Sequence, residues 1–159
     1  MAGDCVMAGF TLRRHGQNGG RAALACGQAM LSRIAVLSER WKHETGVTTA
    51  LGVGMHFGDV ALGLLGPPRH EAWTLVGDTV NVAARLCDRA RGGELLFSDT
   101  LLSSLHSRAH LPAHSGWWGD ESAISVEPLP YKHLHSIVLR GRSAPVDIWC
   151  WPATERVWT

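Results

Sequence analysis

The sequence lacks an excess of charge of either sign and lacks any long apolar run. Its 159 residues include 15 Lys and Arg against 14 Asp and Glu, which gives a formal net charge of +1. Domains that bind nucleic acid usually carry a clear basic excess, so this balance argues against a nucleic-acid partner. No apolar stretch approaches the roughly 20 residues that span a bilayer. We therefore expect no transmembrane segment in this chain.

Cysteine is also sparse. The four residues of this type form no Cys-x-x-Cys pair, which excludes a zinc ribbon and argues against a disulfide framework. The first residues, Met1 to Asp4, carry no basic segment, so we expect no signal peptide. These features together predict a reduced, cytoplasmic chain. The cysteines are Cys5, Cys26, Cys87 and Cys150.

The remaining composition is that of a folded domain. Hydrophobic residues make up 45% of the chain, and the length is close to the roughly 150 residues of one domain. Helix-like and strand-like segments alternate, which predicts an α+β fold with a mostly antiparallel sheet and helices on one face. From about 106 to 135 the periodicity is lost, and we expect a long irregular insertion there.

Three helices are expected from the spacing of apolar residues. The first covers about residues 21–42, with apolar residues three and four apart that would form its buried stripe. The second covers 80–91 and the third 99–105, with Asp99 as its N-cap. The predicted stripe of the first helix consists of Cys26, Met30, Ile34, Leu37 and Trp41.

Short apolar runs predict the strands. The runs at 51–56 and 60–65 flank Phe57-Gly58-Asp59, which is typical of a β-hairpin. The last two strands are expected to follow the insertion as a pair. The other expected strands lie at 5–10, 73–76, 95–97, 136–139 and 145–151.

Residues 73–86 read Trp-Thr-Leu-Val-Gly-Asp-Thr-Val-Asn-Val-Ala-Ala-Arg-Leu and carry the most informative polar pair. Asn81 and Arg85 are four residues apart, so they project from one face of the predicted helix. An arginine fork suits phosphate oxygens, and the first turns of a helix favour anions. The competing interpretation is structural, with Arg85 paired to a carboxylate and Asn81 capping the helix.

Residues 73–86 closely resemble the signature of class III adenylate and guanylate cyclase catalytic domains. Residues 51–60 resemble the family's Gly-Ile-Gly-Ile-His-x-Gly segment, and residues 3–10 its Gly-Asp-x-x-Met-Ala-x-Phe hairpin. Further matches lie at 22–25 and at 139–146. The resemblance implies a ferredoxin-like, cyclase-type sandwich in which the whole chain is a single, partial domain. The family's first strand and the helices after it have no match in this chain.

The resemblance implies a role for each of five residues. Asp4 would bind Mg²⁺ or Mn²⁺, of which the family uses two per site. Asn81 would orient the ribose, and Arg85 would stabilise charge on the α-phosphate. Thr74 would select the purine, because Thr or Asp at this position goes with ATP-type enzymes. Arg140 would contact the triphosphate in place of the family's lysine.

The implied reaction converts ATP to cyclic AMP and pyrophosphate for intracellular signalling, by attack of the ribose 3′ oxygen on the α-phosphorus. The family divides its metal aspartates and its Asn/Arg pair between two subunits, which implies a head-to-tail homodimer. The missing first strand would carry the other metal aspartate, so the chain alone is expected to be inactive or weakly active. Either a fragment of a longer cyclase or a degenerate domain would explain this. The alternatives are a guanylate cyclase and a cyclase-homology module that dimerises or regulates without turnover.

Overall fold

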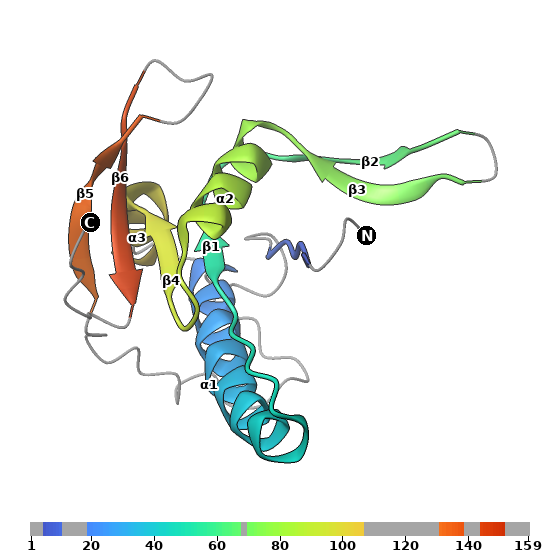
Figure 1. The fold of residues 1–159 in the computed structure, drawn as a ribbon. Coiled ribbons are helices and arrows are strands. Elements are labelled where there is room, and N and C mark those ends of the chain that lie inside the picture. The colour runs from blue at the N-terminus through green and yellow to red at the C-terminus, as the bar shows by residue number, and fades with distance from the viewer. Residues whose placement is uncertain (1–4, 11–18, 68–69, 107–130, 139–143, 152–159) are drawn as a thin grey trace, which may run out of the picture.

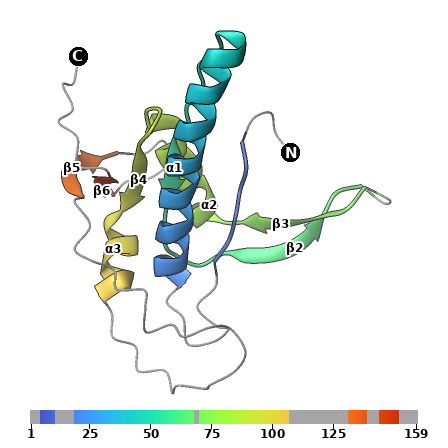
Figure 2. The same cartoon turned by 90° about the horizontal axis from the view of Figure 1, so that it is seen from below.

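The structure is a computed structural model, and it describes residues 5–10, 19–67, 70–106, 131–138 and 144–151. The helices are α1 (Gly19–Thr45), α2 (Asp78–Arg89) and α3 (Asp99–His106). The strands are β1 (Val53–Met55), β2 (Ala61–Leu65), β3 (Ala72–Val76), β4 (Leu95–Ser98), β5 (Lys132–Ile137) and β6 (Val146–Trp151). Among these residues the main sheet has the strand order β1-β4-β6-β5, and β2 and β3 form a separate two-stranded ribbon. The ribbon projects from the body of the domain in both views (Figures 1 and 2).

The predicted hairpin between 51–56 and 60–65 is wrong. β1 pairs in parallel with β4, with Val53 opposite Leu95, while β2 pairs antiparallel with β3, with Gly63 opposite Thr74. Parallel neighbours need a crossover connection, and here the ribbon and α2 supply it. The short link at Phe57-Gly58-Asp59 therefore joins two sheets instead of closing a turn. The antiparallel pair of β5 and β6 at the end of the chain is confirmed.

The α+β class with mostly antiparallel pairing is confirmed, but the helices cover both faces of the sheet. All four residues of β4 are buried, which requires cover on each side. Leu96 packs with α2, whereas Leu95 and Phe97 pack with α1 and α3 on the opposite side. The α1 and α3 helices lie next to each other (Figure 2), and Arg21 Nη2 donates to the Leu105 carbonyl over 3.2 Å. The expectation of helices on one face alone is therefore wrong.

The long first helix is confirmed as α1, but its predicted buried stripe is wrong. Leu24, Gly27 and Leu31 face the sheet, whereas Met30 is 42% exposed and Trp41 is 37% exposed. A Cβ at Gly27 would lie within 2.7 Å of the Leu95 side chain, so the absence of a side chain lets the helix approach the sheet here. Close approach at a glycine determined which face is buried, and counting apolar residues does not detect it. No helix in the described residues is long and apolar enough to cross a membrane.

Two further expectations about boundaries are corrected. Residues 5–10 form no regular strand and are exposed. An apolar run becomes a strand only beside a partner for its backbone groups, and no described strand pairs with these residues. The predicted insertion is also shorter than expected at its end, because β5 begins at Lys132. Residues 107–130 of the insertion lie outside the described part of the chain.

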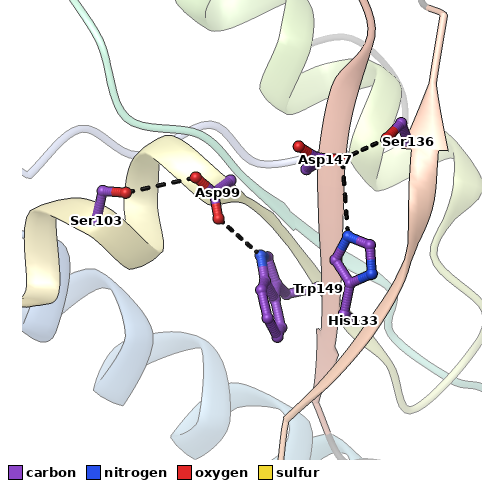
Figure 3. A network of polar contacts seen from close by, with 6 residues as sticks. All are labelled: Asp99, Ser103, His133, Ser136, Asp147 and Trp149. Atoms are coloured by element: carbon purple, nitrogen blue, oxygen red, sulfur yellow. Dashed lines mark hydrogen bonds and ion pairs between the residues drawn. The ribbon is translucent and has the colours of Figure 1, made fainter.

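The N-terminus of α3 is capped by Ser98 and not by Asp99. The Leu101 amide donates to Ser98 Oγ over 3.4 Å. Asp99 is engaged elsewhere, because its carboxylate accepts from Trp149 Nε1 at 3.1 Å and from Ser103 Oγ at 3.4 Å (Figure 3). The indole bond ties α3 to β6. In the neighbouring part of Figure 3, Asp147 bonds Ser136 and pairs with His133 across the last two strands.

Replacing Ser98 by alanine is expected to lower the free energy of unfolding by about 1–2 kcal/mol. Its side chain is fully buried, and its hydroxyl bonds both His56 Nδ1 at 2.7 Å and Thr100 Oγ1 at 2.8 Å besides capping α3. Denaturant titration of wild type and variant measures the loss. Ser103→Ala is the matched control, because Ser103 is exposed on the same helix. Equal losses in the two variants would contradict this account of Ser98.

Candidate functional site

The candidate site lies where the ribbon meets α2. Gly77 joins β3 to α2 and has a φ of 143°, which L side chains rarely adopt. Its carbonyl accepts from the amides of Val80 at 3.2 Å and Asn81 at 3.4 Å, so it starts the helix. No side chain of the N-cap residue closes this helix end. The positive end of the helix dipole at this first turn favours a negatively charged ligand.

Asn81 and Arg85 both lie on α2, one turn apart, as the sequence predicts. Val82 and Leu86 are fully buried against the sheet, and they fix the rotation of the helix about its axis. Asn81, which precedes the buried Val82, is exposed, and Arg85 is half-buried. The buried stripe therefore holds the polar pair at its border, where a ligand can reach both side chains.

The rear of α2 is held tightly on β1. A Cβ at Gly54 would lie 2.1 Å from the Cys87 amide nitrogen and 2.4 Å from the Ala83 carbonyl oxygen. The Cys87 thiol also donates to the Gly52 carbonyl at 3.5 Å. Helix and strand backbones thus touch directly, which leaves the helix little freedom to shift over the sheet.

The other residues predicted for the site fall into two groups. Thr74 is half-buried on β3, the strand that leads directly into α2. The structure thus brings Thr74, Asn81 and Arg85 onto two consecutive elements. Asp4 and Arg140 lie outside the described residues. In the part of the chain that the structure describes, no three His, Cys, Asp or Glu side chains gather into a group that could hold a metal ion.

One contact at the site is not predictable from the sequence pattern. The Thr79 hydroxyl donates to the Asp59 carbonyl over 2.7 Å, which ties the first turn of α2 to the segment that enters the ribbon. A Cβ at Gly58 would lie 2.5 Å from Thr79 Oγ1, so the segment passes close to the helix. The hydrogen-bond partner of Thr79 is a backbone carbonyl, that of Asp59, twenty residues earlier in the sequence. The only signals in the sequence are Gly58 and a hydroxyl in the first helical turn.

The cysteines take no part in this arrangement as disulfides. All four are free in the structure. Cys150 is buried in the core beneath α2, and this burial raises the pKa of its thiol. The group therefore stays protonated and packs as a small apolar side chain.

Chemically, the described residues supply an arginine fork, a carboxamide and a hydroxyl near a helix N-terminus. Arg85 can bind two phosphate oxygens at once, and Asn81 can donate to and accept from a sugar hydroxyl. Thr74 can bond a polar edge of a base. Such a set suits a phosphorylated nucleoside better than an apolar or a cationic ligand.

Comparison with curated proteins finds relatives of greater length. An uncharacterized protein of Mycobacterium bovis and one of Mycobacterium tuberculosis are each 34% identical over 113 residues, which is 69% of this chain. The chain spans about a fifth of the length of these relatives (20%).

Solved structures show the same fold. The adenylyl cyclase CyaB from P. aeruginosa has a TM-score of 0.66 at 22% identity, over 87% of this chain and 61% of that one. The guanylyl cyclase Cya2 has a TM-score of 0.64 at 22% identity, over 89% and 61%. Residues 1–116 also match the sequence model described as the adenylate and guanylate cyclase catalytic domain. The chain therefore belongs to the adenylate and guanylate cyclase catalytic-domain family.

Proposed function

We propose that this chain is the nucleotide-binding part of a cyclase domain that converts ATP to cyclic AMP and pyrophosphate in cytoplasmic signalling. The observation that carries the proposal is the position of Asn81 and Arg85, one turn apart at the border of the buried face of α2. The strand that bears Thr74 leads directly into that helix. A phosphate, a ribose and a purine would thus each find a suitable side chain.

The proposed reaction is intramolecular. The ribose 3′ oxygen forms a bond to the α-phosphorus and releases its proton to water, while the bond from that phosphorus to the bridging oxygen breaks and pyrophosphate leaves. Arg85 would stabilise the charge that develops on the α-phosphate oxygens. Asn81 would hold the ribose so that its 3′ oxygen stays in line with the breaking bond. Arg140 would contact the triphosphate.

A divalent cation, Mg²⁺ or Mn²⁺, would neutralise phosphate charge in this reaction. The described residues do not fit such a site, because no three carboxylate, imidazole or thiol groups among them lie together. Asp4 is the residue we propose as a ligand.

The purine preference rests on Thr74. Solved relatives include both a guanylyl and an adenylyl cyclase, so the fold alone does not select the base. We favour ATP because the resemblance associates Thr at this position with ATP-type enzymes. Thr74 is half-buried on β3, and in this proposal its hydroxyl bonds an edge of the base.

We further propose that the chain works as a head-to-tail homodimer through the ribbon. An isolated two-stranded ribbon is only marginally stable in water, and exposed apolar side chains on it indicate a covered surface. Both strands of the ribbon carry such side chains. They are Leu62, Leu64, Leu65, Trp73 and Val76, each between 41% and 70% exposed.

The proposal is tested by nucleotide binding and by turnover. The chain is expected to bind ATP more tightly than GTP in calorimetric titration with Mg²⁺, and to form little cyclic AMP alone with Mn²⁺. A chimera that places the first strand and following helices of the P. aeruginosa adenylyl cyclase before residue 1 is expected to turn over. Nucleotide binding without product from the chimera would favour the regulatory module instead. Absence of both binding and product would refute the proposal.

A further inference from the structure

The two ends of the ribbon meet beside the first turn of α2. Asp59 lies just before β2 and Gly77 just after β3, and a Cβ at Gly77 would lie 3.4 Å from the Asp59 carbonyl oxygen. The Thr79 hydroxyl donates to that same carbonyl at 2.7 Å. One side chain of α2 therefore closes the base of the ribbon.

The backbone hydrogen bonds at the start of α2 are longer than this contact. Its N-cap residue offers no side-chain hydrogen bond, and the amides of Val80 and Asn81 lie 3.2 and 3.4 Å from the Gly77 carbonyl. These bonds are at or beyond the long end of the usual range, whereas the Thr79 bond is short. Farther along, the helix is fixed by its close approach to Gly54. The Thr79 hydroxyl thus links the first turn directly to the base of the ribbon by a short hydrogen bond.

We infer that Thr79 is a positioning residue that fixes Asn81 relative to the ribbon strand that carries Thr74. The inference rests on the proposed function, in which Asn81 binds the ribose and Thr74 the base of one nucleotide. Thr79 need not contact the nucleotide for this role. Its hydroxyl ties α2 to the residue before β2, and β2 pairs with the strand that carries Thr74.

Three variants of the chain separate this role from general stability. Thr79→Val removes the hydroxyl but keeps the shape of the side chain, and Thr79→Ser restores the hydroxyl. Thr45→Val is the matched control, because Thr45 Oγ1 also donates to a backbone carbonyl, that of Trp41 at 2.8 Å, at the far end of α1. All three variants are expected to fold, and their circular dichroism spectra check this.

Hydrogen exchange of the Val80 and Asn81 amides, followed by NMR, measures how firmly the first turn is held. Thr79→Val is expected to raise their exchange rates about fivefold and to shift the side-chain amide signal of Asn81. Thr79→Ser and Thr45→Val should leave both unchanged. Unchanged exchange and an unchanged Asn81 signal in Thr79→Val would overturn the inference.

Titration with ATP and Mg²⁺ then links this turn to the nucleotide. Thr79→Val is expected to weaken ATP binding about threefold to tenfold, and Thr79→Ser to restore it. Faster exchange with unchanged ATP affinity would overturn the positioning role. If wild type binds no ATP, the proposed function fails, while exchange and the Asn81 signal still decide whether Thr79 fixes this turn.

Discussion

Alanine at position 54 is expected to lower the free energy of unfolding by about 3 kcal/mol or more. The added Cβ would lie 2.1 Å from the Cys87 nitrogen and 2.4 Å from the Ala83 oxygen. Both are backbone atoms of α2, so no side-chain rotation can relieve the contact. The helix would have to move away from β1, and the fully buried Val82 and Leu86 would lose their packing.

Denaturant titration of wild type and Gly54→Ala measures the loss in free energy of unfolding. Alanine variants of two other glycines give values for comparison. Gly63→Ala is the matched control, because nothing lies within 4 Å of a Cβ at that strand position, and it should change stability by less than about 0.5 kcal/mol. Gly27→Ala should be intermediate, because its Cβ would meet only side-chain tips of Met55 and Leu95 at under 3 Å. A Gly54→Ala protein as stable as Gly63→Ala would contradict the direct contact between helix and strand.

Removal of the Arg85 guanidinium is expected to lower kcat of the chimera by about a hundredfold to a thousandfold. In the proposed reaction this group meets charge that grows on the α-phosphate, so its loss affects the transition state more than substrate binding. Arg85→Lys keeps the charge but not the planar fork, and it should recover only part of the rate. Cyclic AMP formation with Mn²⁺ and ATP, measured by mass spectrometry, gives kcat and KM.

Arg89→Ala is the matched control for Arg85, since Arg89 is exposed one turn farther along α2. Its kcat should stay within a few-fold of wild type. The folded state of each variant is checked by its denaturation midpoint. A rate for Arg85→Ala within a few-fold of wild type would refute the role proposed for this residue.

Local patterns in the sequence predicted most of the helices and strands. The helices at 21–42 and 80–91 appear as α1 and α2, because apolar spacing over several turns is a strong signal. The pairing of β1 was not predictable in this way. A short link after an apolar run is typical of a hairpin. The partner of β1 is instead β4, which lies about forty residues later in sequence, and the connection between them contains the packed helix α2.

The buried face of α1 and the N-cap of α3 were predicted wrongly, because both depend on contacts between individual atoms. The buried face of α1 depends on the close approach at Gly27, which periodicity does not reveal. Asp99 is a good capping residue by type, but its carboxylate is drawn to the Trp149 indole, fifty residues away, and Ser98 caps instead.

The candidate site was predicted where a motif is continuous in sequence. Asn81 and Arg85 share a helix, so their spacing fixes their relation before any fold is known. Thr79 lies in the same motif, between Thr74 and Asn81, but its hydrogen-bond partner is the backbone carbonyl of Asp59, outside the motif. Every residue has a backbone carbonyl, so the sequence does not reveal which carbonyl the Thr79 hydroxyl will contact. That contact follows from the path of the chain through the ribbon.

The parallel pairing of β1 with β4 also sets an order of assembly. The pairing of Val53 with Leu95 closes a loop that contains the ribbon and α2, so earlier formation of the ribbon and of the contact between α2 and Gly54 would lower the entropy cost of closing it. Contacts so distant in sequence slow folding. Antiparallel β5 and β6 need only a short connection and can form early, whereas the surface that presents Asn81 and Arg85 depends on pairings of β4 with β1 and β6 that join residues far apart in sequence.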